Sequence, residues 1–403
     1  MKSPTSASSN GVIASPENFS LVLGGPLFQL FLRARLSDDA LQLARKRALV
    51  VALFAWLPLL LLSTFERHLF GGSTTVPFVM DLEVHVRFLI AVPLLIGAEL
   101  MVHQSLRPAV QQFLERQLIP DGAMAQFDAA IASSFRLRNS VLAEVLMIAF
   151  VYGVGVSVVW RQYLALDAAT WYATPTAAGA HLSFAGIWYG YVSLPVFQFL
   201  LCRWYFRIGI WAHFLWQVSR IKLNLIPTHP DRNAGLGFLT GTFCAFGLLA
   251  AAHGALVAGQ IANRIYFLGA TLPEFKMQIA VLVIIMLCIV FAPLLSFAPQ
   301  LDQAKRTGNR EYGTLASRYV REFDSKWLRG GAPANEPLVG SGDIQSLADL
   351  GNSMEVVRTM RIAPITADGV LRLAAAVLVP IAPLTLTMMP LDELAKMLLG
   401  LVF

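Results

Sequence analysis

Three ionisable residues lie within long apolar stretches of the sequence, where charge is costly. Glu99 and His103 are one helical turn apart, and Glu144 lies about one turn inside the next apolar stretch. An ionisable group at membrane depth is a functional candidate, because burying it without a partner is expensive. These three side chains could bind a proton or a cation, or they could pair with arginines for purely structural reasons. A metal site would need further ligands, which the sequence does not indicate.

A second candidate is the turn 224–238, whose two prolines exclude a helix and whose later residues predict the start of one. Backbone N–H groups at such a start, with His229 and Arg232, could hold a phosphate or a lipid headgroup. Further positive charge would come from the preceding helix: Arg203, Arg207 and Arg220. Alternatively, Asp231 caps the new helix, Arg232 pairs with Asp231 or with headgroups, and His229 merely packs.

The chain lacks the short motifs of common enzyme classes. It contains no GxSxG, HExxH, Walker A or CxxCH pattern, and the pair Gly235 and Gly237 alone is a weak signal. Its three cysteines lie in or beside uncharged runs, where a thiol usually behaves as a small buried hydrophobe. We therefore expect no cofactor and no metal, and an enzyme is the less favoured alternative.

These candidates sit in a chain that is too apolar for an ordinary soluble domain. Of 403 residues, 56% are hydrophobic and 14% are charged, against roughly 45–50% and 25% in soluble domains. Seven runs are long enough, or nearly so, to cross about 30 Å of hydrocarbon: 48–65, 86–105, 140–160, 182–202, 236–260, 277–298 and 372–390. The fold class we predict is all-α, a polytopic transmembrane helix bundle of about seven spans, with the lipid bilayer as its main partner.

The spans divide the chain into four parts. Residues 1–36 should form a disordered tail and a short interfacial helix that begins at Pro26. Residues 37–298 should hold spans one to six, and residues 372–403 the seventh span with an outer amphipathic tail. Between them, 299–371 should be a cytoplasmic helical segment. Within the fifth span, His253, Gln260 and Asn263 should make interhelical hydrogen bonds.

The distribution of lysine and arginine predicts the orientation. One side of the predicted membrane carries 25 of these residues and the other carries 6, which places the N-terminus in the cytoplasm and the C-terminus outside. We attribute the net charge of +6 to the basic residues that set the orientation in the membrane, and we expect no nucleic-acid partner. Residues 203–221 should form a basic, aromatic helix at the inner interface, with Trp204, Trp211 and Trp216 at headgroup level.

The segment 299–371 has an aromatic repeat and little other apolar content. Tyr312, Tyr319, Phe323 and Trp327 recur at helical spacing and predict a helix to about Leu328. Two short helices, 344–350 and 353–360, should follow. The segment is too polar to form a large independent core, so we expect the aromatic face to lie against the bundle or to dock a cytoplasmic protein partner.

Three stretches together resemble a group of uncharacterised bacterial multi-pass membrane proteins: HPDRNAGLGF from His229, GDIQSLADL from Gly342 and APLTLT from Ala382. The similarity would cover most of the chain after residue 40. It implies a bacterial inner (plasma) membrane setting, and it assigns no activity and no functional residue.

We rank the functional hypotheses as follows. The leading one is binding or transport of an ion or small anionic solute through a polar site on the cytoplasmic side, in which Glu99 and Arg232 meet. The second is a membrane scaffold or signalling accessory that docks a protein through residues 299–371. An enzyme acting on lipid phosphates is third.

Overall fold

The computed structural model describes residues 19–26, 28–29, 43–71, 74–160, 169–176 and 179–388, and it is an all-α bundle. Five of its helices are long and apolar enough to span a membrane, and two bent helix pairs raise the number to as many as seven. The predicted fold class of about seven spans is confirmed, and the chain is a multi-pass membrane protein. Of the predicted disordered tail 1–20, residues 1–18 lie outside the described residues, as does the outer segment 391–403, and the four-part division stays a prediction. Phe19 and Ser20 are buried, so the tail prediction was wrong for these two residues.

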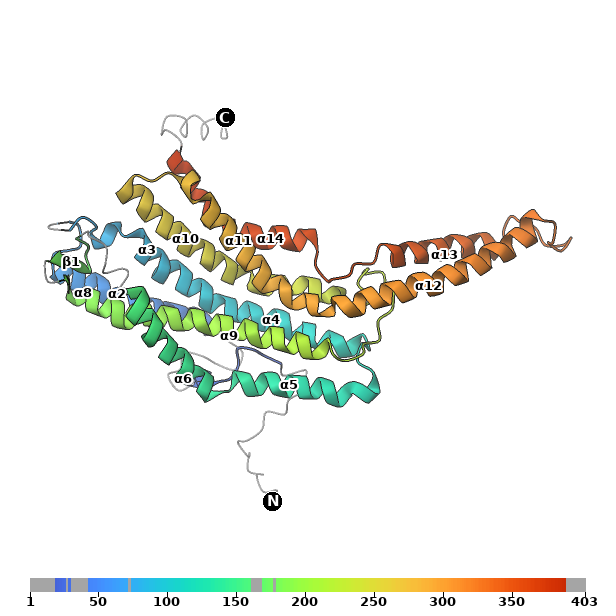
Figure 1. Cartoon of the computed structure of the whole chain (residues 1–403), viewed down its shortest axis with the longest axis horizontal. Helices are drawn as coiled ribbons and strands as arrows, with labels where there is room; N and C mark the ends of the chain where they lie inside the picture. The colour runs from blue at the N-terminus through green and yellow to red at the C-terminus, as the bar shows by residue number, and fades with distance from the viewer. Residues whose placement is uncertain are drawn as a thin grey trace, which may run out of the picture.

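The first half of the bundle contains three candidate spans and one bent helix pair. Their elements, with η marking 3-10 or π-helical segments, are α2 (Ala44–Phe65); α3 (Leu82–His85), η3 (Val86–Ala91) and α4 (Val92–Glu115); α5 (Met124–Arg138), α6 (Val141–Phe150) and η5 (Val151–Trp160); and α8 (Phe184–Trp188), η6 (Tyr189–Ser193) and α9 (Leu194–Val218). Helices α4, α5 and α9 run along the long axis of the molecule (Figure 1). Helices α5 and α6 meet at 46°, and α5 packs along α9.

The second half holds two candidate spans, a second bent helix pair and a projecting pair of helices (Figure 1). Its elements are η7 (Leu236–Phe246) and α10 (Gly247–Leu268); η8 (Leu272–Phe275), α11 (Lys276–Phe291), η9 (Ala292–Phe297), α12 (Ala298–Phe323) and η10 (Asp324–Leu328); α13 (Gly342–Arg358); and α14 (Ala367–Leu378) with η11 (Ala382–Met388). Elements η8 to η10 form one helix of 57 residues, whereas α14 and η11 meet at 56°. A short hairpin, β1 (Ala173–Thr176) and β2 (Gly179–Leu182), and two single turns, η2 (Phe78–Met80) and η4 (Asp121–Ala123), complete the described elements.

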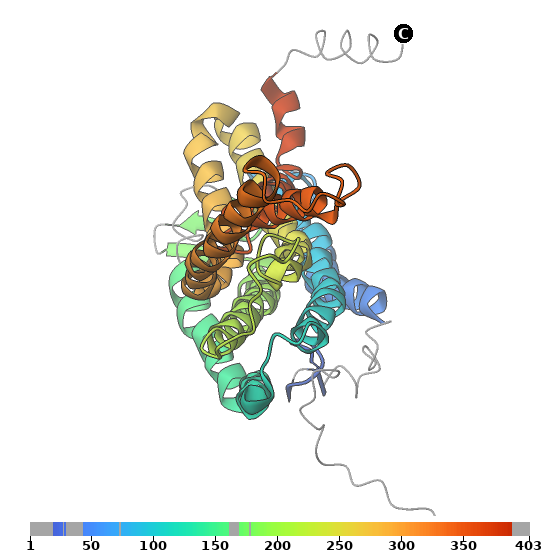
Figure 2. The ribbon, with the colours of Figure 1, turned by 90° about the vertical axis from the view of Figure 1, so that its right-hand side faces the viewer.

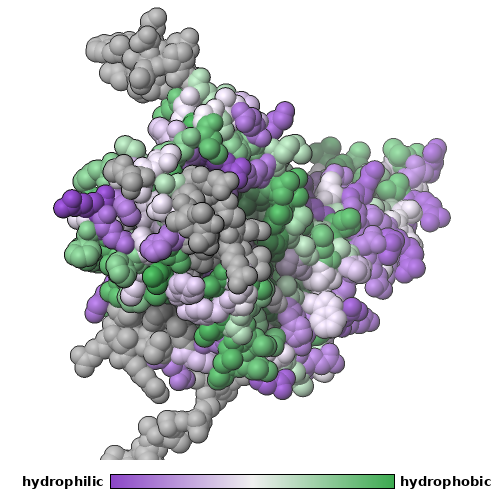
Figure 3. Space-filling view, turned by 60° about the vertical axis from the view of Figure 1, so that its left-hand side comes forward, coloured by the Kyte–Doolittle hydropathy of each residue, from purple (hydrophilic) through white to green (hydrophobic). Residues whose placement is uncertain are grey.

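The spans present apolar side chains on their outer surface as well as in the buried interior. On α2, Leu49 and Leu61 are about 60% exposed, while Ala55 and Leu59 are fully buried. This pattern suits a helix with lipid on one side and a bundle on the other. In the space-filling view, hydrophobic surface covers much of the bundle and hydrophilic residues gather over the projecting end (Figure 3).

Interhelical hydrogen bonds form where the sequence predicts them. His253 Nε2 lies 2.6 Å from the Tyr205 hydroxyl on α9, and Gln278 Nε2 donates to Gln260 Oε1 at 3.1 Å. Asn263 Nδ2 donates to the buried carboxylate of Asp81 at 2.7 Å. The three polar residues of the fifth span therefore tie α10 to three different parts of the chain.

Helices α12 and α13 lie side by side and project beyond the other helices as an arm (Figures 1 and 2). The predicted helix end at Leu328 is confirmed. Its aromatic face packs on α13, since the Tyr319 hydroxyl and Trp327 Nε1 donate to the carbonyl and carboxylate of Asp343 at 3.0 and 2.9 Å. The two predicted short helices were wrong, because α13 is one continuous helix through Gly351.

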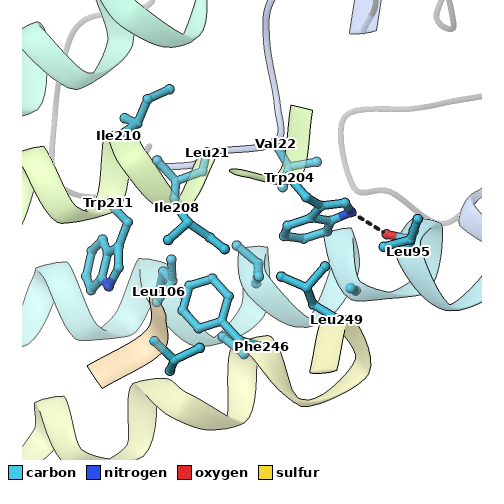
Figure 4. Packing of buried hydrophobic residues seen from close by; sticks show 14 of the residues in the cluster. Leu21, Val22, Leu95, Leu106, Trp204, Ile208, Ile210, Trp211, Phe246 and Leu249 are labelled. Atoms are coloured by element: carbon cyan, nitrogen blue, oxygen red, sulfur yellow. Dashed lines mark hydrogen bonds between the residues drawn. The ribbon is translucent and has the colours of Figure 1, made fainter. Parts of the chain in front are cut away.

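Over most of its length, helix α9 is packed inside the protein. Trp204 and Trp211 are 2% and 1% exposed, and Trp204 Nε1 donates to the Leu95 carbonyl at 3.0 Å (Figure 4). Trp204 and Trp211 therefore contact protein and not lipid headgroups, while Trp216 is 48% exposed, and the membrane level of all three stays a prediction. The helix has two faces as expected, but a second layer of protein covers its polar face.

Candidate functional site

A cluster of buried charges joins three helices. Glu99 on α4 is 5% exposed, and its two carboxylate oxygens face guanidinium groups from different directions. Arg47 on α2 pairs with Oε2, and Arg207 on α9 donates from Nη1 to Oε1 at 2.7 Å. One carboxylate thus holds α2, α4 and α9 together through two ion pairs in a low-dielectric environment.

A second ion pair lies one turn away on α9. Arg203 is 7% exposed, and its Nη2 is 3.9 Å from Oε1 of Glu144 on α6. That separation is too long for a hydrogen bond. Within the described residues, Arg203 makes no hydrogen bond at all, although a buried guanidinium normally has several acceptors.

Arg203 lines a small pocket between α5, α6 and α9. The lining residues are Leu21, Arg138, Glu144, Met147, Arg203, Phe206, Arg207 and Ile210. The pocket volume is about 10 Å³, which is close to the minimum that one water molecule requires. Three guanidinium groups and one carboxylate therefore share a space for a single small species.

The described N-terminal residues complete this pocket. Arg138 Nη1 donates to the Ser20 carbonyl at 2.6 Å, and the N–H of Gly25 donates to Asn139 Oδ1 at 3.1 Å. Gly25 has a φ of +86°, and a Cβ there would lie 3.3 Å from Glu144 Oε1. His103, a predicted ion-site residue, contacts Ser20 Oγ through Nδ1 at 3.0 Å and does not join the Glu99 ion pairs.

Asp231 caps the turn 224–238. Its carboxylate accepts from the N–H groups of Asn233, Gly235 and Gly237 at 2.8, 3.2 and 2.8 Å. It also lies 3.0 Å from His229 Nδ1 and 3.5 Å from Arg116 Nη1. Of the two alternatives for this turn, the hydrogen bonds match the one in which Asp231 is the cap, because the protein's own carboxylate occupies the N–H groups that a phosphate would need.

The structure does not bring Arg232 to Glu99. Arg232 is exposed and has a left-handed backbone φ of 56°, and its carbonyl accepts from the N–H of Arg361 at 2.8 Å. Glu99 has Arg47 and Arg207 as its counter-charges, with Arg203 nearby. Arg220 is also exposed and stacks on the ring of Trp216 at 5.1 Å. The expected meeting of Glu99 and Arg232 was wrong because buried arginines already satisfy Glu99.

Sequence reasoning missed Arg47, Arg138 and the segment 19–25 as parts of the site. Arg47 lies on the same buried stripe of α2 as Ala44, Ala55 and Leu59, and this helical spacing was a usable signal. Arg138 is the last residue of α5, a helix that we did not predict from the sequence. Nothing in the composition of 19–25 distinguishes a buried segment from a tail.

The described residues contain no group of three His, Cys, Asp or Glu side chains that could hold a metal ion. The buried cluster carries excess positive charge and would repel a metal ion. Four guanidinium groups surround two carboxylates among the described residues: Arg47, Arg138, Arg203 and Arg207 around Glu99 and Glu144. Arginine forks are well suited to small oxyanions and halides because they offer several N–H donors and a fixed charge.

The cap at Asp231 predicts a pH effect. Burial alone raises the pKa of this carboxyl, but the N–H groups of Asn233, Gly237 and Gly235 and the nearby His229 outweigh it, and the pKa falls below the ordinary value of 3.8. A carboxyl whose pKa is lower in the folded state stabilises the protein above its unfolded pKa, and this stabilisation is lost as the pH falls through the folded pKa.

We therefore expect Asp231→Asn to lower the unfolding free energy by about 1–3 kcal/mol near neutral pH, because the amide oxygen caps the N–H groups less strongly than the carboxylate does. The difference in unfolding free energy between variant and wild type should shrink below about pH 4, because the wild-type carboxylate becomes protonated there. Thermal unfolding in detergent over a series of pH values measures this. A difference that stays constant down to pH 2 would contradict the capping role.

The chain matches no protein-family model, no curated protein and no solved structure. The conclusions about its fold therefore rest on the helices themselves, and those about its site rest on the geometry given above.

Proposed function

We propose that this membrane protein binds a small inorganic anion in the pocket beside Arg203. The observation that carries the proposal is the state of the Arg203 guanidinium, which is buried, lines a pocket and donates no hydrogen bond within the described residues. Its nearest counter-charge is 3.9 Å away. A buried charge with unmet hydrogen-bonding capacity is costly, and an anion in the pocket would supply the missing acceptor.

The size and lining of the pocket define the class of ligand. A pocket with room for about one water-sized species favours a monatomic anion such as chloride over an organic one. Arg138 and Arg207 would add charge from two sides, while Glu144 would oppose the anion and keep its affinity moderate. The same reasoning disfavours a cation, because three guanidinium groups would repel it.

The proposed setting is the inner membrane of a bacterium, with the N-terminus in the cytoplasm. The bias of lysine and arginine supports the orientation, and the resemblance described above supports the setting. In that orientation the pocket lies toward the cytoplasmic ends of the spans, since Arg47 is near the start of α2.

Chloride or bromide should stabilise the purified protein in a saturable way. We expect an increase of about 2.7 kcal/mol in unfolding free energy at a concentration 100 times the Kd. Gluconate at equal ionic strength should give no such increase, because it is too large for the pocket. Thermal unfolding in a neutral detergent measures both anions, and Arg203→Gln should abolish the halide-specific part.

Arg220→Gln is the matched control, since Arg220 lies just beyond the same helix but is exposed. It should keep the full response to halide. An equal halide response in Arg203→Gln, or none in the wild type, would rule out the site. Bromide bound next to Arg203, seen by anomalous scattering in crystals, would locate the anion directly.

A scaffold role for the α12–α13 arm is the second candidate. One observation favours it, namely that the arm projects from the bundle (Figure 1) and exposes apolar residues near its tip, with Val339 89% and Leu328 69% exposed. If the arm docks a protein, Val339→Asp should reduce the proteins that co-purify without changing thermal stability. An unchanged set of co-purifying proteins would rule this role out.

A further inference from the structure

A buried carboxylate lies at the end of the bundle opposite the α12–α13 arm, where β1, α3 and α8 are found (Figure 1). Asp81 directly precedes the candidate span that begins at Leu82, and it is 4% exposed. Among the described residues, no lysine, arginine or histidine forms an ion pair with Asp81. Such a carboxyl is a candidate for binding a proton, because its neutral form avoids the cost of burying an uncompensated charge.

Three hydrogen bonds hold the Asp81 carboxylate in place. Oδ2 accepts from the indole Nε1 of Trp171 at 2.8 Å, while Oδ1 accepts from Asn263 Nδ2 at 2.7 Å and from the N–H of Val84 at 3.3 Å. The orientation of the Asn263 amide is fixed, because its own Oδ1 accepts from the N–H of Leu82 at 2.9 Å. One carboxylate therefore joins the start of the second span to α10 and to the segment 169–176.

The charges around Asp81 favour a bound proton. Burial raises the pKa of this carboxyl above its ordinary value of 3.8, and the negative charge of Glu83 raises it further, while the three hydrogen bonds act in the opposite direction. Arg87 does not offset the charge, since it pairs with Glu83 and with the Tyr189 hydroxyl. The other titratable side chains on the elements around Asp81 form no hydrogen bond or ion pair with it: His85, Tyr172, His181 and Arg264.

A proton on this carboxyl would face a hydrogen-bond donor. A neutral carboxyl carries one O–H group, and both oxygens of Asp81 already accept from donors. Oδ1 has two such partners and Oδ2 has one. Protonation of Oδ2 therefore loses the fewest hydrogen bonds, and the bond that it loses is the one from Trp171.

We infer that Asp81 is a proton-binding site, and that protonation releases the Trp171 indole and loosens the segment 169–176 from residues 75–81. Trp171 is the link between these segments, because its N–H donates to the Val76 carbonyl at 3.0 Å and its carbonyl accepts from Ser183 Oγ at 2.9 Å. None of these residues lines the Arg203 pocket, so the proton site is distinct from the proposed anion site.

The test is a pH titration of the full-length protein in detergent, in gluconate buffer without halide. Infrared difference spectra follow the C=O band of a neutral carboxyl, and tryptophan fluorescence follows the release of Trp171. Both signals should change with one midpoint, at a pH above 3.8. Asp81→Asn should remove both changes. Trp171→Phe should remove the fluorescence change, keep the band and raise its midpoint, because the charged form loses a hydrogen bond.

Glu83→Gln should lower the midpoint, because it removes the negative charge that acts on Asp81. The matched control is Glu66→Gln, which should leave both signals unchanged. Glu66 lies at the same end of the bundle and accepts from the N–H groups of Phe184 and Ala185, but it is partly exposed.

A carboxyl band that persists in Asp81→Asn, or a midpoint at or below pH 3.8 in the wild type, would overturn the proton site. If Asp81→Asn does not fold, equal midpoints in the wild type, Trp171→Phe and Glu83→Gln would overturn it as well. A band that titrates with no change in fluorescence would overturn the release of Trp171.

Discussion

Replacing Glu99 by Gln is expected to cost about 3–5 kcal/mol of unfolding free energy, the largest effect of any charge-neutralising substitution in the bundle. The carboxylate is the shared partner of Arg47 and Arg207. An amide keeps the shape but removes the negative charge, so two buried guanidinium groups lose a counter-charge at once. Thermal or denaturant unfolding in detergent, compared with the wild type under the same conditions, measures the loss.

Glu115→Gln is the control for this substitution, because Glu115 is the exposed last residue of α4. A surface carboxylate contributes about 0–1 kcal/mol, so the two variants should differ clearly. Glu99→Gln should also bind bromide more tightly, since the pocket beside Arg207 becomes more positive. If Glu99→Gln were as stable as Glu115→Gln, the ion pairs would not hold the three helices together.

The architecture of the bundle could be predicted from sequence because lipid imposes a simple rule on long apolar runs. The rule is about length and polarity, so it identified the spans containing α2, α9 and α11 without any knowledge of packing. It could not show that α5 packs along α9, because α5 has the charges of a surface helix. The bend between α5 and α6 at Asn139 likewise has no strong sequence signal.

The buried charges could be predicted only in part. Glu99 and Glu144 stood out because a carboxylate within an apolar run must be paired, and pairing with Arg207 and Arg203 was one of the alternatives considered. The partner Arg47 was missed, since a cation at the start of a span looks the same whether it faces headgroups or the bundle. Whether Arg47 faces the headgroups or the bundle depends on the rotation of α2 about its axis, which tertiary packing sets.

The turn at Asp231 was ambiguous for a different reason. The same N–H groups that attract an external anion also attract a nearby carboxylate, and the sequence contained both possibilities. The structure selects the internal ligand, because Gly237 allows the Asp231 side chain to approach to within 2.7 Å of where a Cβ would be. The anion site that we propose lies instead at the pocket beside Arg203, where arginines outnumber carboxylates.

The close contact between α10 and α14 predicts a second large effect, which also tests whether α14 belongs to the bundle as part of the seventh span. A Cβ on Gly254 would lie 2.0 Å from the carbonyl oxygen of Val377. Backbone atoms cannot move aside as a flexible side chain can, so Gly254→Ala must push the two helices apart. We expect a loss of about 1–3 kcal/mol or more from this overpacking.

Gly247→Ala provides a control of opposite sign on the same helix, because nothing lies within 4 Å of a Cβ added at Gly247. Alanine has a higher helix propensity than glycine by about 1 kcal/mol, so this variant should be as stable as the wild type or more stable. Unfolding of the two variants in detergent decides the matter. If Gly254→Ala proved as stable as Gly247→Ala, α14 would not pack on α10, and the number of spans in the bundle would fall below seven.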